Sequence, residues 1–203
     1  MLSRPLKLGF LASGNGSSAL AIVGAIRAGQ LAAEARLLVS NNRGAQALAS
    51  AAAAGVPSLC VPTQKDPDAA DARLTDEMRA RGVELIVLSG YLRHLGPRTL
   101  AAYAGRIVNI HPGPLPEFGG AGMYGARVHA AVIAAGWTAS AAVIHLVDEE
   151  YDHGPELVRQ VVPVAAADTP ETLEARVRAL EPEFFVETLR RIAAGDLRLP
   201  AAG

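Results

Sequence analysis

The chain has 203 residues and a formal net charge of −1, and half of its residues are apolar, many of them alanine. This length and composition suit one α/β domain or two small ones, with helices that pack closely on small side chains. Basic residues are spread along the chain and nearly balanced by acidic ones, which argues against a nucleic-acid partner and an anionic membrane surface. A single cysteine, Cys60, excludes an internal disulfide and predicts a reducing, cytoplasmic location.

Strand-like and helix-like patterns alternate along the chain. The first half predicts a buried strand at 6–13, a helix with serine caps at 17–29, a strand at 35–41, a helix at 44–55, a short strand at 58–62 with Cys60 in the core, a helix at 68–82 and a central strand at 84–90. The second half predicts a short helix after Pro97, a strand at 106–112, a helix at 125–136, strands at 140–148 and 156–164, and a last helix that Thr169 caps before Pro170. No apolar run approaches the roughly 18 residues that span a bilayer, so no membrane segment is expected.

This alternation is typical of an α/β fold with a doubly wound, mostly parallel sheet. The connection at 149–155 is too short for a crossover helix, so strands 140–148 and 156–164 are expected to pair antiparallel as a C-terminal extension of the sheet. No linker or repeat divides the chain, which predicts a single domain over 1–203. In such a sheet ligands bind at the carboxyl ends of the strands. Four polar clusters follow strands there: "SGNGSS", "SGYLRHL", "NIHP" and "DEEYDHG".

The Gly-rich turn after the first strand matches the G-x-G-x-x-G/A dinucleotide pattern at Gly14, Gly16 and Ala19. A nicotinamide site would need an acidic residue at the end of the second strand, and that strand ends "VSNNRG". The turn therefore favours a phosphate monoester, held by helix N–H groups and the hydroxyls of Ser17 and Ser18. A plain tight turn with capping serines is the alternative.

The strand end "NIHP" places Asn109 and His111 on the same face of a strand. An amide donor beside a protonated imidazole stabilises an oxygen that gains negative charge, and the imidazole then passes a proton to a leaving amine. Carboxylates that keep such a histidine protonated are available in the later acidic loop, at Asp148, Glu149, Glu150 and Asp152. This set indicates acyl or formyl transfer without a covalent enzyme intermediate.

Two other interpretations of these residues stay open. "NIHP" is also compatible with an ordinary strand end, and His145 in its apolar strand reads as a hydrogen-bonded core residue or as a residue that supports the site from behind. A metal site of His111, His145, Asp148 and Asp152 is conceivable, but no H-x-H or H-E-x-x-H spacing supports it, so no metal is expected.

The proline-rich segment 111–125 has polyproline and turn character, so it is expected to cover the site as a rigid loop. Leu115–Pro116 is a candidate cis bond.

Taken together, "LASGNGSS", "LSGYLRHLGP", "AGRIVNIHPGPLP", "EEYDHGP" and "VPV…DTPETLEARV…E" resemble the phosphoribosylglycinamide formyltransferases over nearly the whole chain. This family is the folate-dependent formyltransferase family of purine synthesis. The resemblance implies a Rossmann-like formyltransferase fold. It also implies transfer of the formyl group of 10-formyltetrahydrofolate to the amine of glycinamide ribonucleotide on the way to IMP, with no metal cofactor.

The resemblance also implies roles for individual residues. Asn109 and His111 polarise the formyl group and bind the oxyanion, while Asp152 tunes His111 and assists proton movement through water. The phosphate-binding half, about 1–105, holds the ribose phosphate; the folate and catalytic half is about 106–203. The substrate-binding residues are Gly16, Ser17, Ser18 and Glu181, the last near the nucleophilic amine. The folate-binding residues are Leu92, Arg93, His94, Leu95, Asn109, Asp148, Glu149, Glu150, Tyr151 and Asp152.

The sequence departs from the family pattern at three places. Ser18 stands where many relatives have asparagine, and "TQKDPDAAD" lacks an arginine that some relatives offer to the folate tail. "EFGGAGMYG" differs from the best-known members, so Met123 and Tyr124 are expected to alter the grip on the ribose. The partners expected are small molecules, and the protein is expected to be a monomer or a homodimer.

Three other functions are weighed against this one. The first is a related formyltransferase or a formyltetrahydrofolate deformylase, which usually carry a further domain or a basic path for tRNA. The second is a nucleotide-dependent oxidoreductase, which the missing acidic residue after the second strand disfavours. The third is a binding module without turnover.

Overall fold

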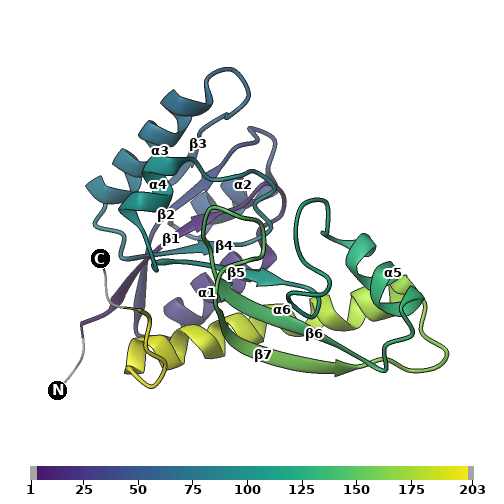
Figure 1. Ribbon diagram of the computed structural model, residues 1–203. Helices are drawn as coiled ribbons and strands as arrows, with labels where there is room; N and C mark the ends of the chain where they lie inside the picture. Colours follow the sequence, from purple (N-terminus) through teal and green to yellow (C-terminus); the bar gives the residue numbers. More distant parts are fainter. Residues whose placement is uncertain (1–3, 201–203) are drawn as a thin grey trace.

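The computed structural model describes residues 4–200, which form one seven-stranded sheet with six helices around it (Figure 1). The strands are β1 (Leu6–Leu11), β2 (Ala33–Ser40), β3 (Ser58–Cys60), β4 (Leu85–Leu88), β5 (Ile107–His111), β6 (Ala139–Leu146) and β7 (Glu156–Pro163). The helices are α1 (Ser17–Arg27), α2 (Gln46–Ala53), α3 (Pro67–Ala80), α4 (Pro97–Ala102), α5 (Ala126–Ala134) and α6 (Pro170–Ala194). None of these helices is long and apolar enough to cross a membrane.

The strand order is β3-β2-β1-β4-β5-β6-β7, and the first five strands in this order run parallel. The predicted antiparallel pairing of β6 with β7 is confirmed. The antiparallel part is one pairing larger than predicted, because β6 also runs antiparallel to β5. The reason is that α5 does not serve as a crossover on the sheet: it packs on α6, so the chain enters β6 from the end at which β5 finishes.

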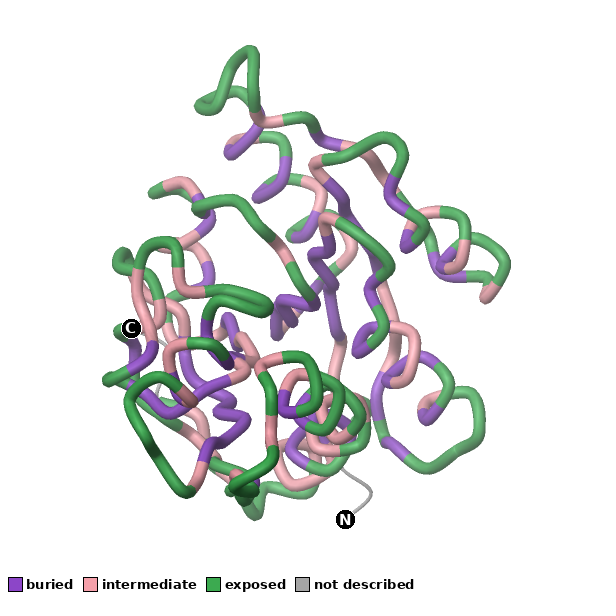
Figure 2. Tube along the Cα trace, turned by 90° about the vertical axis from the view of Figure 1, so that its right-hand side faces the viewer, coloured by how far each residue is buried: buried purple, intermediate pink, exposed green. Residues whose placement is uncertain are grey.

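Helices cover both faces of the sheet, as the buried strands require. The side chains of α1, α2 and α6 pack on one face around Phe10, Leu38 and Val87, and α3 and α4 cover the other face around Leu37, Ile86 and Ile107. Figure 2 shows the buried segments gathered in the middle of the molecule, with exposed turns around them. Alanines contribute much of the first layer, which allows α1 and α2 to lie close to each other. Cys60, predicted in the core, is half-buried at the end of β3.

Local capping signals in the sequence account for the starts of α3 and α6 but not for the start of α1. Thr169 caps α6 as predicted: its hydroxyl accepts from the N–H of Thr172, and Pro170 is the first helical residue. Asp66 caps α3 in the same way. The predicted serine caps of α1 are wrong, because Gly16 is the N-cap residue, with a left-handed φ of 66°, and the helix begins at Ser17. A left-handed turn favours glycine there, and neither serine can replace it.

Candidate functional site

The four polar clusters predicted at the carboxyl edge of the sheet meet in the structure. The hydroxyl of Ser13, after β1, donates to Asn41 Oδ1 at 2.6 Å and accepts from the N–H of Leu92 at 2.9 Å. In turn, His94 Nε2 lies 2.8 Å from the carbonyl oxygen of Glu149. The ends of β1, β2 and β4 and the loop after β6 therefore enclose one region, to which β5 contributes Asn109 and His111.

Asp152 lies at the centre of this region with its carboxylate between two histidines. Its Oδ2 is 3.3 Å from His111 Nδ1 and its Oδ1 is 3.5 Å from His145 Nε2, while the N–H of Gly120 donates to Oδ2 at 3.2 Å. Burial by itself would raise the pKa of Asp152, but the hydrogen bonds and positive charges of His111 and His145 outweigh it and hold this pKa well below its usual range. Asp152 is therefore ionised throughout the physiological range.

Hydrogen bonding on both sides fixes the ring of His111. Its Nε2 lies 2.7 Å from the carbonyl oxygen of Phe118, and a carbonyl only accepts, so Nε2 carries a proton. Its Nδ1 faces the ionised Asp152, a contact that is attractive when Nδ1 also carries a proton. We assign these protons from the network of partners. The geometry therefore favours an imidazolium at His111 paired with the carboxylate of Asp152.

His145 lies beside Asn109. Its Nδ1 donates to the carbonyl of Leu146 at 2.8 Å, and its Nε2 lies 3.2 Å from Asn109 Nδ2 and 3.5 Å from Asp152 Oδ1. The ring therefore contacts both the amide and the carboxylate. The sequence left His145 as either a core residue or a residue that supports the site. Its link to Asn109 arises because the two residues are opposite each other in the β5–β6 pairing.

The proline-rich loop covers His111, as the sequence predicts. Leu115–Pro116 is cis, and Leu115 and Phe118 are buried. The loop supplies the Phe118 carbonyl to His111, and His111 is only 2% exposed. Gly119 passes close to the site, because a Cβ there would lie 3.0 Å from Asp152 Cβ.

The Gly-rich turn has the shape of an anion site at the start of α1. A Cβ on Gly16 would lie 2.9 Å from Ala47 Cβ, so the turn packs tightly against α2. The N–H of Ser17 donates to Asn15 Oδ1 at 3.3 Å and that of Ala19 to Ser89 Oγ at 3.1 Å. Within residues 4–200, the N–H groups of Gly16 and Ser18 have no described partner. Two donors at a helix N-terminus are thus available to a phosphate. The side chain of Ser17 is exposed and that of Ser18 is buried.

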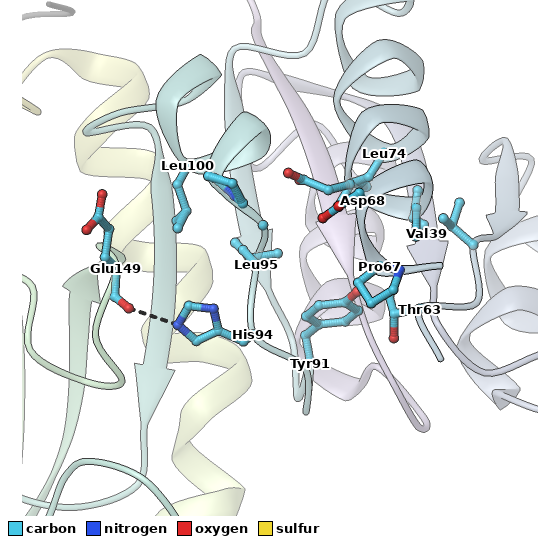
Figure 3. A pocket seen from close by; sticks show the side chains of 15 residues that line it. Val39, Thr63, Pro67, Asp68, Leu74, Tyr91, His94, Leu95, Leu100 and Glu149 are labelled. Carbon is cyan, nitrogen blue, oxygen red and sulfur yellow. Dashed lines mark hydrogen bonds between the residues drawn. The ribbon is translucent and has the colours of Figure 1, made fainter. Parts of the chain in front are cut away.

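Two adjoining cavities lie between the 91–97 segment and the rest of the site. The smaller, of about 60 Å³, contacts Asn109 and His145 and is lined by most of the predicted folate-binding residues: Arg93, His94, Leu95, Asp148, Glu150, Tyr151 and Asp152. The larger, of about 550 Å³, shares Tyr91, His94 and Leu95 with it and extends to α3, as Figure 3 shows. Glu149 lines the larger cavity, whereas Leu92 is 62% exposed and lines neither.

The larger cavity was not foreseen from the sequence. Its walls are mainly apolar and include Tyr91, Leu74 and Leu100, with Thr63 and Asp68 towards α3. Burial raises the pKa of the Tyr91 hydroxyl to about 12, so this hydroxyl is neutral at neutral pH. A concave apolar space with few polar groups is the usual environment for a flat heterocycle.

Glu181 lies on α6 in a largely buried position. Burial raises the pKa of its carboxyl to about 7, although the positive charges of Arg178 and His111 act in the opposite direction. His129 of α5 is fully buried, and neither ring nitrogen has a partner among the described residues. Burial lowers the pKa of His129, so this ring is neutral.

The raised pKa of Glu181 predicts how stability depends on pH. Below about pH 4.5 the carboxyl is protonated in both the folded and the unfolded chain. As the pH rises towards 7 only the unfolded chain ionises, so the free energy of unfolding falls, by about 2–3 kcal/mol in total. Chemical denaturation between pH 4 and 8 should show this fall in the wild type and its absence in Glu181→Gln. Glu183→Gln, an exposed neighbour on α6, should behave as the wild type; parallel curves for all three proteins would contradict the buried carboxyl.

The alternative metal site is not formed. Asp148 pairs with His153 at 2.9 Å, and no group of three or more His, Cys, Asp or Glu side chains in residues 4–200 is arranged to hold a metal ion. That the reaction needs no metal remains a prediction.

Comparison with known proteins agrees with this geometry. The model of the formyl transferase family matches residues 6–189. A chloroplastic phosphoribosylglycinamide formyltransferase of Vigna unguiculata is 39% identical over 191 residues; the match covers 93% of this chain but only 61% of that protein. The phosphoribosylglycinamide formyltransferase of Bacillus subtilis (strain 168) is 36% identical over 188 residues, which cover 92% of this chain and 94% of the relative.

A solved structure has the same architecture. The phosphoribosylglycinamide formyltransferase of Coxiella burnetii superposes with a TM-score of 0.88 at 36% identity, and the match covers 98% of this chain and 92% of the other. The parallel strands and the antiparallel C-terminal pair therefore belong to a known architecture. On the family match and these relatives, the chain belongs to the formyl transferase family.

Proposed function

We propose that this chain transfers the formyl group of 10-formyltetrahydrofolate to the amine of glycinamide ribonucleotide, in purine biosynthesis. The observation that carries the proposal is the hydrogen-bonded set of Asn109, His111, His145 and Asp152 at the end of β5, in a chain whose relatives are phosphoribosylglycinamide formyltransferases. The match covers only 61% of the Vigna unguiculata relative, and the proposal does not extend to the remaining part of that protein.

Each residue has a stated part in the reaction. The substrate amine attacks the formyl carbon, the C=O bond opens and the oxygen becomes an oxyanion, which Asn109 Nδ2 and the imidazolium of His111 stabilise. The C=O bond then re-forms as the C–N bond to the folate breaks, and the proton that the attacking amine loses is delivered to the leaving nitrogen. Asp152 keeps the positive charge on His111 and relays that proton, through water. For His111 to reach the oxyanion, its Nε2 must leave the Phe118 carbonyl.

The remaining residues bind the two substrates. The free N–H groups at the start of α1 hold the ribose phosphate together with Ser17 and Ser18, and Glu181 binds the glycinamide end. The two adjoining cavities take the folate, with Arg93 to Leu95 on one wall and Asp148 to Asp152 on the other. Residues 1–105 and 106–203 act as the two halves of one domain. The oligomeric state, monomer or homodimer, and the cytoplasmic location stay predictions; the Vigna unguiculata relative is a chloroplastic protein.

A formyl-transfer assay tests the proposal directly. Purified wild type and His111→Ala receive 10-formyltetrahydrofolate and glycinamide ribonucleotide, and mass spectrometry detects the formylated ribonucleotide. Product from the wild type alone is the expected result. Loss of formyl from the folate without the ribonucleotide would indicate a deformylase instead. No consumption of folate would contradict a formyltransferase function, and binding of a nicotinamide cofactor in its place would favour an oxidoreductase.

A further inference from the structure

Helix α4 has no capping side chain of its own. Its N-cap residue is Gly96, and the first-turn N–H groups of α4 are bound by Asp71, which belongs to α3. The N–H of Arg98 donates to Asp71 Oδ2 at 2.8 Å and that of Thr99 to Oδ1 at 3.1 Å. A carboxylate that accepts two backbone N–H groups at a helix start does the work of an N-cap residue, but here it comes from a different helix.

Further contacts lock this cap in the interior. Asp71 is 7% exposed, and the hydroxyl of Thr99 donates to its Oδ1 at 2.5 Å. The hydroxyl oxygens of Thr75 and Thr99 lie 2.9 Å apart, so α3 and α4 also touch beside the cap. A Cβ on Gly96 would lie 2.2 Å from Asp71 Cγ, which shows how closely the chain passes over the carboxylate. Three donors therefore occupy the two oxygens, and Asp71 has little capacity left to bind a ligand itself.

The segment that this cap holds forms a wall of the larger cavity. Tyr91, His94, Leu95, Gly96, Pro97 and Leu100 all line that cavity, as does Asp71. His94 and Leu95 also reach the smaller cavity, which contacts Asn109. Figure 3 shows Tyr91, His94, Leu95 and Leu100 around this space. A shift of the start of α4 would therefore move the wall that lies beside the proposed folate.

We propose that Asp71 is a positioning residue for the folate-binding wall at 91–97, which it holds through the N-terminus of α4. The inference rests on the proposed function, because it names the folate as the occupant of this cavity. It assigns Asp71 no contact with the reacting atoms. Loss of the cap should therefore weaken binding of the folate and leave binding of the ribonucleotide and the chemical step unaffected.

The test compares steady-state constants of the wild type, Asp71→Asn, Asp71→Ala and Thr99→Val for both substrates. Leaving a buried N–H without its acceptor should raise KM for 10-formyltetrahydrofolate about tenfold in Asp71→Ala, and less in Asp71→Asn, which keeps one acceptor oxygen. kcat and KM for glycinamide ribonucleotide should change by less than about twofold. The matched control is Thr169→Ala, since Thr169 caps α6 through the N–H of Thr172 and lines neither cavity.

The outcomes separate the two proposals. A wild type that transfers no formyl group contradicts the proposed function. If the wild type transfers the formyl group but the folate KM of the Asp71 variants equals that of Thr169→Ala, the positioning role alone is contradicted. An equal rise of both KM values contradicts it as well. If Asp71→Ala does not fold, Asp71→Asn and Thr99→Val decide, since each removes part of the same set of hydrogen bonds.

Discussion

Asp152→Asn should lower kcat about 100- to 1000-fold, with little change in either KM. The substitution keeps the size and shape of the side chain but removes its charge. His111 then loses the anion that lies 3.3 Å from its Nδ1, and the imidazolium that stabilises the oxyanion is no longer favoured. Asparagine tolerates the left-handed backbone at this position, so the fold should be retained. The measurement is kcat for formylated product, with thermal unfolding to confirm folding.

Asp76→Asn is the control for this variant, because Asp76 is an exposed aspartate on α3 away from both cavities. Its turnover should equal that of the wild type. Near-normal turnover of Asp152→Asn would remove Asp152 from the catalytic mechanism. A loss of kcat accompanied by a fall of the unfolding temperature well beyond that of the control would point to a structural role instead.

Asn109→Ala should also cost about 100- to 1000-fold in kcat, because under the proposed function it removes the amide that donates to the formyl oxygen. The structure holds this amide beside a buried ring, since Nδ2 lies 3.2 Å from His145 Nε2. Since Asn109 is half-buried at the end of β5, the alanine variant should fold and still bind both substrates. Product formation under saturating substrates measures the loss.

A second substitution at position 109 distinguishes donation from shape. Asn109→Asp has the same outline but no amide N–H, and it sets a negative charge beside the developing oxyanion. It should therefore be at least as slow as Asn109→Ala. If the aspartate variant turned over faster than the alanine variant, the side chain would act through its shape or its polarity rather than as a hydrogen-bond donor.

Local patterns predicted most of the fold correctly. The apolar runs and the Thr169 and Pro170 start signal located strands and helices, and the short 149–155 connection predicted the β6–β7 pairing. What could not be predicted depends on tertiary contacts. The antiparallel pairing of β5 with β6 follows from α5 packing on α6, and no residue pattern within either strand predicts it.

Which side chains come together at the candidate site was predicted in part. Asn109, His111 and Asp152 come together because the carboxyl ends of strands share an edge, which the sequence implies. A supporting role for His145 was one of two interpretations, but its contact with Asn109 was not predicted, because it depends on the antiparallel pairing of β5 with β6. His111 contacts the backbone carbonyl of Phe118. Every residue has such a carbonyl, so the sequence gives no signal for this contact. Asp71 was missed because it caps a helix other than its own.

The backbone of Asp152, with φ at 56°, restricts how this position can vary over time. Glycine, asparagine and aspartate adopt this conformation at the least cost, and only aspartate among them carries a carboxylate. A glutamate would keep the charge but strain the backbone and lengthen the side chain. Asparagine and glycine are therefore the substitutions that the backbone at position 152 tolerates best. Either one gives a protein that folds but lacks the carboxylate paired with His111. A relative with asparagine or glycine here would be expected to have kept the architecture for some purpose other than formyl transfer.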